Sequence, residues 1–303
     1  MEKLSSVSFQ GVKKQKEKKN VKGGIGAMCA GSLASMASLP VGLLAMNNLT
    51  KPSQGLTKDQ IQIANNGAQR VLDEITNLSK KGVEIVDCKE KTFMANTLPE
   101  WLLNVISPVD ATTNGKNAFF LGGASGNQKA ILKMAGLKDN SILVNKDKLP
   151  LATFHEMGHA FNSNNSKFWK SMQKMRNPMK LVGSLFMLLP AITKEHKAKE
   201  GEELTARQKF TNGLRKASPF LATASFIPMF AEETMATIRG NKWAKEVFKD
   251  TPELAKKVAK SNKWGLISYG AVALATGFAT WVVKKVKDNS DAKKEMKAYA
   301  HQG

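Results

Sequence analysis

The chain has 303 residues, of which 42% are hydrophobic, and its formal net charge is +21. Only two tyrosines are present, and no basic stripe alternates with aromatic residues, so composition excludes the usual pattern of a nucleic-acid-binding protein. The lysines cluster beside apolar blocks, which favours anionic membrane lipid as a partner. The length allows one large domain or two small ones.

The N-terminal part of the chain is basic and then apolar. Residues 1–23 form a basic tail with seven lysines and two glutamates. The small-residue-rich segment 24–46 is predicted to be a membrane helix. A signal peptide is the alternative, although the basic region before the segment is long for one. Cys29 lies in this segment and Cys88 ends a predicted strand, and both are expected to be free thiols.

Residues 54–263 are predicted to form one domain of mixed helices and strands, in the α+β class. An apolar stripe from Ile61 to Ile75 predicts an amphipathic helix, which is expected to stop near Gly82. Three short apolar runs then predict strands at residues 83–87, 117–121 and 141–145.

The motif with the clearest chemistry is His155-Glu156-Met157-Gly158-His159. Residues four apart lie on one face of a helix, so both imidazoles can bind a single Zn²⁺. Glu156 projects from the adjacent part of that face, where it is expected to act as general base towards a zinc-activated water. Gly158 would let a strand or a substrate backbone come close to the helix.

The surroundings of this motif favour the metal interpretation. Apolar and small neighbours indicate a buried helix, which Pro150 is placed to begin and residues 162–165 are placed to end. Two imidazoles without a partner would be costly to bury there, and a metal removes that cost. The alternative is a surface helix with two unconnected histidines.

A catalytic zinc needs a third protein ligand and one open position. Residues 162 and 165 are asparagines, which excludes the metzincin continuation. The pair Glu232-Glu233 offers a carboxylate. Glu233 shares a helix face with Ala236 and Gly240, whose small size lets that face pack against the metal helix.

Glu232 is the alternative metal ligand. It shares its face with the bulkier Met235 and Arg239, which suit a lipid or solvent boundary. A charged pair that marks the membrane boundary is the non-functional interpretation of both glutamates. His196 is the next candidate, in a lysine-rich stretch that is expected to be poorly organised.

Three more apolar segments follow the metal motif. Residues 181–193 and 219–231 each contain a proline and are short for a full span, so they are either buried helices or a hydrophobic hairpin in the membrane. Residues 264–283 carry no charge, have tryptophan near both ends, and are predicted to form a membrane helix. Gly270, Ala273 and Gly277 give that helix one close-packing face, and residues 284–303 form a basic C-terminal tail.

This arrangement resembles the membrane-embedded gluzincins, the family of the HtpX heat-shock protease and the CaaX prenyl protease. The matching features, in chain order, are Asn117-Ala118-Phe119, a second strand, the HExxH motif, two short apolar blocks and Glu233-Thr234-Met235-Ala236. The resemblance covers about residues 115–240. It favours the hairpin at 181–231 and favours Glu233 over Glu232.

The resemblance implies a zincin-like metalloprotease domain that binds one Zn²⁺ per chain and acts on a protein or peptide substrate. It also implies that the strand of Asn117, Ala118 and Phe119 aligns the substrate backbone. Thr237 is a departure, because the family has an aspartate there that supports the metal site. No oxyanion donor is singled out among His196, Arg239 and Tyr269.

The sequence therefore predicts an integral-membrane zinc endopeptidase of the cell membrane, with His155, His159 and Glu233 as metal ligands and Glu156 as catalytic base. Thr237 motivates the alternative, a non-catalytic zincin-like membrane scaffold or binding protein. Positive charge beside the apolar segments places the metal site outside the cell, whereas the resemblance places it in the cytoplasm. The side of the membrane stays open.

Overall fold

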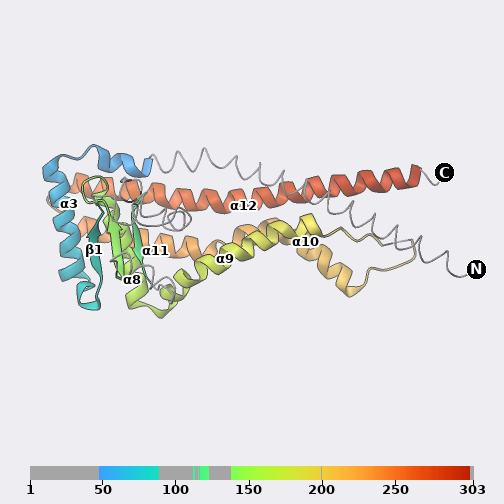
Figure 1. Cartoon of the computed structure of the whole chain (residues 1–303), viewed down its shortest axis with the longest axis horizontal. Coiled ribbons are helices and arrows are strands. Elements are labelled where there is room, and N and C mark those ends of the chain that lie inside the picture. The colour runs from blue at the N-terminus through green and yellow to red at the C-terminus, as the bar shows by residue number, and fades with distance from the viewer. Residues whose placement is uncertain are drawn as a thin grey trace, which may run out of the picture. The chain divides into compact units, whose positions relative to one another are not determined.

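A computed structural model describes residues 48–88, 112, 115, 117–122, 138–198 and 200–300 of the chain. These residues are mostly helical, with one small three-stranded sheet (Figure 1). The predicted membrane segment 24–46, including Cys29, lies outside the described residues. Cys88 is a buried free thiol, as expected.

The first described helices follow local sequence signals. Residues 48–54 are helical, and α3 (Lys58–Arg70) begins with a capping box, in which Thr57 accepts from the Gln60 amide and Gln60 accepts from the Thr57 amide. A π-helical turn (Val71–Ile75) and a 3₁₀ turn (Ser79–Lys81) lead to Gly82, whose φ of 77° suits glycine. The predicted helix and its stop are confirmed.

The sheet has the strand order β1-β3-β2. Its central strand β3 (Ser141–Val144) is parallel to β1 (Glu84–Asp87) and antiparallel to β2 (Phe119–Leu121), and all four residues of β3 are buried. Three strands were predicted at these places. However, β2 begins only at Phe119, so the expected strand position of Asn117 and Ala118 is wrong and both residues precede the strand.

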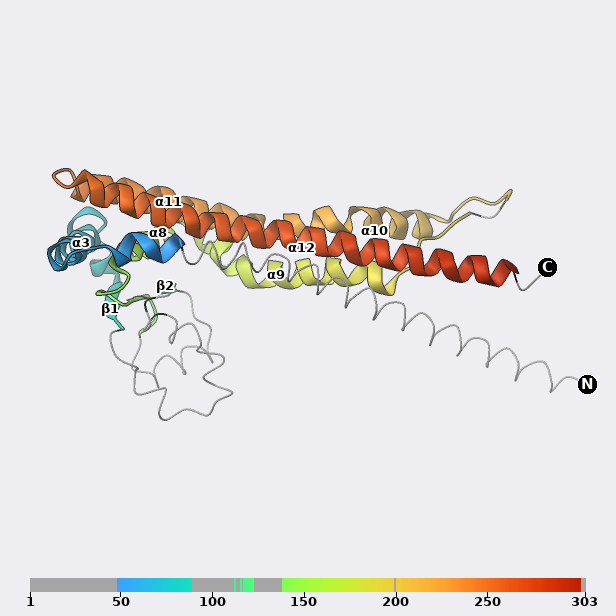
Figure 2. The same ribbon diagram turned by 90° about the horizontal axis from the view of Figure 1, so that it is seen from above.

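The described residues divide into two compact units. The site unit contains residues 48–176 and Pro228–Gly270, and the helical unit contains Asn177–Ile227 and residues 271–300. In the site unit, a 3₁₀ turn (Pro150–Ala152) leads into α8 (Thr153–Asn165), which lies against β2 and β3. Two views show α3, the sheet and α8 side by side (Figures 1 and 2).

Hydrophobic packing fixes the orientation of α8. Phe154 and Met157 are fully buried in the main core cluster together with residues of α3 and β3. The Phe154 ring meets Phe248 edge to face, with ring centroids 5.2 Å apart. Because these side chains hold one face of α8 in the core, the histidines of the motif are directed away from it.

Four helices complete the chain: α9 (Lys167–Ile192), α10 (Ala206–Ala224), α11 (Ile227–Val247) and α12 (Pro252–Ala300). The apolar block 219–231 is not one element, because α10 ends and α11 begins within it. The stretch between the two apolar blocks is partly helical, since α10 starts at Ala206. Residues 284–300, the described part of the predicted basic tail, continue α12 as helix.

Close backbone approaches hold the helical unit together. A Cβ atom added at Gly277 of α12 would lie 1.9 Å from Thr223 Oγ1 and 3.0 Å from the Pro219 carbonyl oxygen of α10. Ala273 of α12 is also buried. Gly277 therefore packs closely, as predicted, whereas a Cβ at Gly270 would make only an ordinary contact with Phe230, at 3.6 Å.

By length and composition, α12 is the one described helix able to cross a membrane: it has 49 residues, and its most apolar stretch has a mean hydropathy of 1.6. Large apolar side chains are exposed along it, at Ile267, Val272, Leu274, Phe278 and Trp281. The helices that contain the two shorter apolar blocks do not meet this test.

Candidate metal centre

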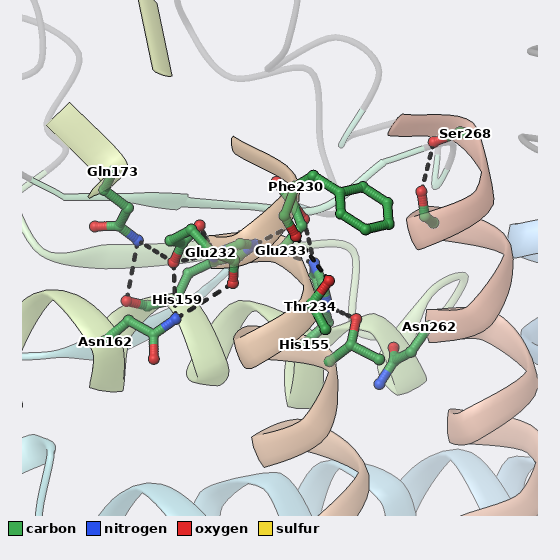
Figure 3. Close-up of polar contacts among 12 residues, drawn as sticks. His155, His159, Asn162, Gln173, Phe230, Glu232, Glu233, Thr234, Asn262 and Ser268 are labelled. Carbon is green, nitrogen blue, oxygen red and sulfur yellow. Dashed lines mark hydrogen bonds and ion pairs between the residues drawn. The ribbon is translucent and has the colours of Figure 1, made fainter. Parts of the chain in front are cut away.

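Three of the predicted ligands meet at one point of the site unit (Figure 3). His155 and His159 lie one turn apart on α8, and their Nε2 atoms are 3.0 Å apart. Glu233 of α11 reaches them with Oε2, which is 3.0 Å from His155 Nε2 and 3.3 Å from His159 Nε2. The groups His155/Glu156/His159 and His159/Glu232/Glu233 could each hold a metal ion.

Two glycines allow α11, which carries Glu233, to lie close to α8. A Cβ at Gly158 would lie 2.3 Å from the Ala236 carbonyl oxygen, and one at Gly240 would lie 2.6 Å from the Phe154 carbonyl oxygen. The backbones of α8 and α11 are therefore in direct contact, as the small residues beside Glu233 predicted. The expectation that Gly158 admits a strand or substrate is wrong, because α11 fills that space.

Glu232 is also part of the centre. Its side chain is fully buried, and Oε1 lies 2.9 Å from His159 Nδ1. The same oxygen accepts hydrogen bonds from Asn162 Nδ2 at 2.8 Å and Gln173 Nε2 at 3.0 Å. The prediction that Glu232 faces a lipid or solvent boundary is wrong. A carboxylate on the second ring nitrogen fixes the orientation of a histidine, which here directs Nε2 at Glu233.

Thr237 contacts His155 in the way that Glu232 contacts His159. Its Oγ1 lies 3.3 Å from His155 Nδ1. Each imidazole is therefore held through Nδ1 and offers Nε2 to the centre. The hydroxyl of Thr237 thus contacts His155 at the position where the gluzincin family has an aspartate.

Arg176 is a member of the centre that the sequence did not reveal. It lies on α9 and donates hydrogen bonds to Glu233 Oε1 and to Glu232 Oε2, the latter at 3.5 Å. Its guanidinium also lies over the Tyr269 ring, 5.8 Å from the centroid. The only sequence signal is an arginine in a stretch whose other cations are lysines.

The charges of this cluster do not balance. The carboxylates of Glu156, Glu232 and Glu233 face the guanidinium of Arg176, which leaves an excess of two negative charges when all three carboxylates are ionised and both imidazoles are neutral. Glu156 is 7% exposed and the other two carboxylates are fully buried. Buried charge of one sign requires compensation, either by protons or by a cation.

The direction of the pKa shifts follows from this imbalance. Burial acts to lower the pKa of His159, but Glu233 and Glu232 raise it well above its usual value. Burial acts to raise the pKa of Glu233, but His159, His155 and Arg176 hold it well below its usual range. The cluster therefore draws either a proton or a metal cation to the imidazoles, and the two compete.

Glu156 is in a different environment from the other two glutamates. Burial raises the pKa of its carboxyl, and the two nearby imidazoles only partly oppose this. Within the described part of the chain, its carboxylate makes no hydrogen bond or ion pair. It is thus free to exchange a proton with a molecule in the centre.

The remaining predicted residues make contacts other than those with the two histidines. Asn117 is exposed before β2, and Ala118 packs in a small core cluster with Val144. Arg239 donates to Asn162 Oδ1 and stacks over Phe161, so it supports the Asn162 contact with Glu232. His196 belongs to the helical unit, where its backbone is hydrogen-bonded to Asn212.

Comparison with known proteins assigns no family to this centre. No protein-family model, curated protein or solved structure matches the chain.

Proposed function

We propose that the chain is an integral-membrane zinc endopeptidase of the gluzincin type. The observation that supports this most is the convergence of His155 Nε2, His159 Nε2 and Glu233 Oε2, at distances of 3.0 to 3.3 Å, beside the Glu156 carboxylate. In this proposal α8, α11 and the small sheet make up a zincin-like catalytic domain.

The choice of zinc rests on donor type, spacing and charge. Two imidazole nitrogens and one carboxylate oxygen are a common donor set of catalytic zinc, and such a set leaves one position open. Ligand atoms around a tetrahedral Zn²⁺ lie roughly 3.3 to 3.5 Å apart, slightly wider than the spacing found here. A divalent cation would also neutralise the two excess negative charges. When bound, Zn²⁺ supplies Lewis acidity that lowers the pKa of water and polarises a carbonyl group.

Glu156 is the proton carrier in this proposal. It accepts a proton from the attacking water and returns it to the leaving nitrogen. The raised pKa and the absence of a competing partner among the described residues suit that double role. Glu232 and Thr237 position the two imidazoles, and Arg176 positions Glu233 through the oxygen that faces away from the histidines.

The substrate in this proposal is an extended polypeptide. In the described sheet, β2 pairs with β3 only and thus has a free edge. The unpaired amide and carbonyl groups of an edge strand can align a peptide by strand addition. Phe119 begins this edge and Asn117 precedes it, whereas the buried Ala118 packs inside the domain.

Residues 264–283 of α12 anchor the protein in the cell membrane in this proposal. They form the most apolar part of the long helix, and large apolar side chains on it are exposed. Exposed apolar side chains also occur on the shorter blocks, at Leu181, Leu185, Ile192, Phe220, Ile227 and Phe230. These side chains suit contact with lipid, so the helices that carry them are placed in or against the bilayer.

Metal content and turnover test the proposal together. The detergent-purified full chain should contain about one Zn²⁺, and His155→Ala or His159→Ala should remove it. Glu156→Gln should keep zinc and lower cleavage of unfolded casein by about a thousandfold or more. Glu246→Gln, on an exposed part of α11, is the matched control and should cleave at the parental rate.

Each outcome has a distinct meaning. Zinc retained at the full level in both histidine variants would refute the ligand assignment. A parent chain that holds zinc but cleaves no test polypeptide would favour the non-catalytic scaffold. Parental turnover by Glu156→Gln would remove Glu156 from the mechanism.

A further inference from the structure

The helical unit contains a second polar centre, made of residues other than the metal ligands. A cavity of about 320 Å³ is lined by Glu195, Asn212, Gly213, Arg215, Lys216 and Lys284. Three of these residues are cationic and one is anionic. The volume falls at the lower end of the range for small-ligand sites, which is roughly 300 to 1,000 Å³.

The cavity lies where the apolar segments of this unit end. Glu195 follows the apolar block 181–193 by two residues, and Lys216 precedes the block 219–231 by three. Lys284 directly follows the apolar segment 264–283. Three segments thus change from apolar to polar at the level of one cavity, which is the level of lipid headgroups if the segments enter a bilayer.

Arg215 is the buried cation of the cavity lining. It is 1% exposed, and its guanidinium donates hydrogen bonds to the carbonyl oxygens of Pro190 and Thr193 and to Asp288. Its Nε is buried without a hydrogen-bond partner among the residues that the structure describes. A buried donor without a partner is costly, so the Arg215 guanidinium is incompletely compensated by the residues around it.

The charge around the cavity has a positive excess. Lys284 shares Asp288 with Arg215, at 2.8 Å from Asp288 Oδ2, so two cations compete for one carboxylate. Lys216 is exposed and makes no ion pair with any residue in the described ranges. Glu195, the acidic residue of the lining, offsets only one of these charges.

We propose that this cavity binds the phosphate group of a membrane lipid headgroup. Arginine, lysine and asparagine side chains are donors that match phosphate oxygens, and basic pockets between membrane helices select anionic headgroups. Glu195 can accept a hydrogen bond from a headgroup hydroxyl, which suits phosphatidylglycerol. The proposal rests on the membrane placement in the proposed function and is independent of the zinc site.

Gly213 is a lining residue at which a larger side chain can be introduced. A Cβ added there would meet no atom within 4 Å, and the residue is helical and lines the cavity. Gly213→Leu therefore adds a bulky side chain at the lining, where its Cβ meets no atom, and raises helix propensity. Gly213→Ala adds only a methyl group at the same position. Lys216→Gln removes one cation, and Arg207→Gln removes an exposed cation from the same helix outside the lining.

Native mass spectrometry of the full chain in non-ionic detergent measures the lipid bound. The probes are phosphatidylglycerol, diacylglycerol with the same acyl chains, and inorganic phosphate. The parent should retain phosphatidylglycerol but not diacylglycerol. Gly213→Leu should lose it, Lys216→Gln should weaken it about fivefold, and Gly213→Ala and Arg207→Gln should bind close to the parental level.

Several results would overturn the proposal. Equal retention of diacylglycerol would show binding through acyl chains alone. Displacement of the lipid by inorganic phosphate at similar concentration would show a site for free anions. Unchanged binding by Gly213→Leu would place the lipid elsewhere. Zinc content and casein cleavage, measured on the same samples, should be parental in Gly213→Leu, so failure here differs from failure of the peptidase proposal.

Discussion

The two units solve the problem of buried charge in opposite ways. In the site unit, three carboxylates and two imidazoles from α8 and α11 share one centre, and a single guanidinium serves two of the carboxylates. In the helical unit, the buried Lys287 pairs with Asp291 one turn later on α12, and Arg215 and Lys284 meet Asp288. The first cluster is left negative and the second is left positive.

The difference shows what distinguishes a ligand site from a structural ion pair. A pair four residues apart on one helix forms as soon as the helix forms, because both partners lie on the same helix face. A shared centre requires two helices to dock, and its lone pairs converge. The excess charge then indicates the sign of the ligand: a cation for the site unit and an anion for the helical unit.

The strongest test of the shared centre separates its two adjacent carboxylates. Glu233→Gln should lower zinc affinity more than a hundredfold, because an anionic ligand becomes a neutral amide. Glu232→Gln should lower it about ten- to a hundredfold, because the negative charge beside His159 Nδ1 is lost. Competition with a zinc-binding dye measures both, with Glu246→Gln as control. Full affinity in Glu232→Gln would leave that carboxylate without a positioning role.

The docking of α11 on α8 can be weakened without touching a charged group. Gly158→Ala or Gly240→Ala puts a methyl group within 2.3 to 2.6 Å of a backbone carbonyl oxygen on the other helix. Each change should lower the free energy of unfolding by about 1 to 3 kcal/mol and reduce zinc affinity. Gly55→Ala, where a Cβ meets nothing within 4 Å, is the control for denaturant unfolding. Parental stability in both variants would contradict the close contact.

A smaller effect on zinc affinity is expected when the contact between Thr237 and His155 is removed. Thr237→Val keeps the side-chain shape but removes the hydroxyl beside His155 Nδ1. Zinc affinity and casein cleavage should fall about tenfold. Thr237→Asp supplies a carboxylate at the same contact and should retain at least the parental affinity. A valine variant that matches the parent in both assays would show that the threonine hydroxyl does not position His155.

The smallest effect is expected for a paired charge in the helical unit. Burial acts to raise the pKa of Asp288, but Lys284 and Arg215 hold it below its usual value. A lowered folded-state pKa stabilises the protein above the unfolded pKa of about 3.9, and this contribution is lost as pH falls through the folded pKa. The midpoint difference between the parent and Asp288→Asn should therefore shrink below about pH 4 in thermal unfolding. Asp250→Asn, at an exposed position, should show no such trend.

Sequence patterns anticipated features that depend on near neighbours. The stop at Gly82 and the shared helix face of His155 and His159 both involve residues within four positions of each other. The small face beside Glu233 was also predictable, because residue volume along one helix face can be read directly. These features required no knowledge of distant contacts.

Features that depend on distant partners were missed. Glu232 shares a helix face with bulky residues, yet its contacts with His159 and Gln173 come from positions 73 and 59 residues away in the chain. Arg176 lies among lysines, and nothing nearby marks it as the residue that binds two glutamates. Pro228 looked internal to one apolar block, but it is the second residue of α11, where a proline favours the start of a helix.

The separation of the ligands along the chain has a consequence for biosynthesis. Glu233 lies 78 residues after His155, so a growing chain exposes the two histidines long before the carboxylate exists. In the proposed zinc site, tight metal capture must wait until α11 is made and docked. Metal loading would then report complete folding, and the free metal concentration would set the lifetime of the finished protein against proteolysis.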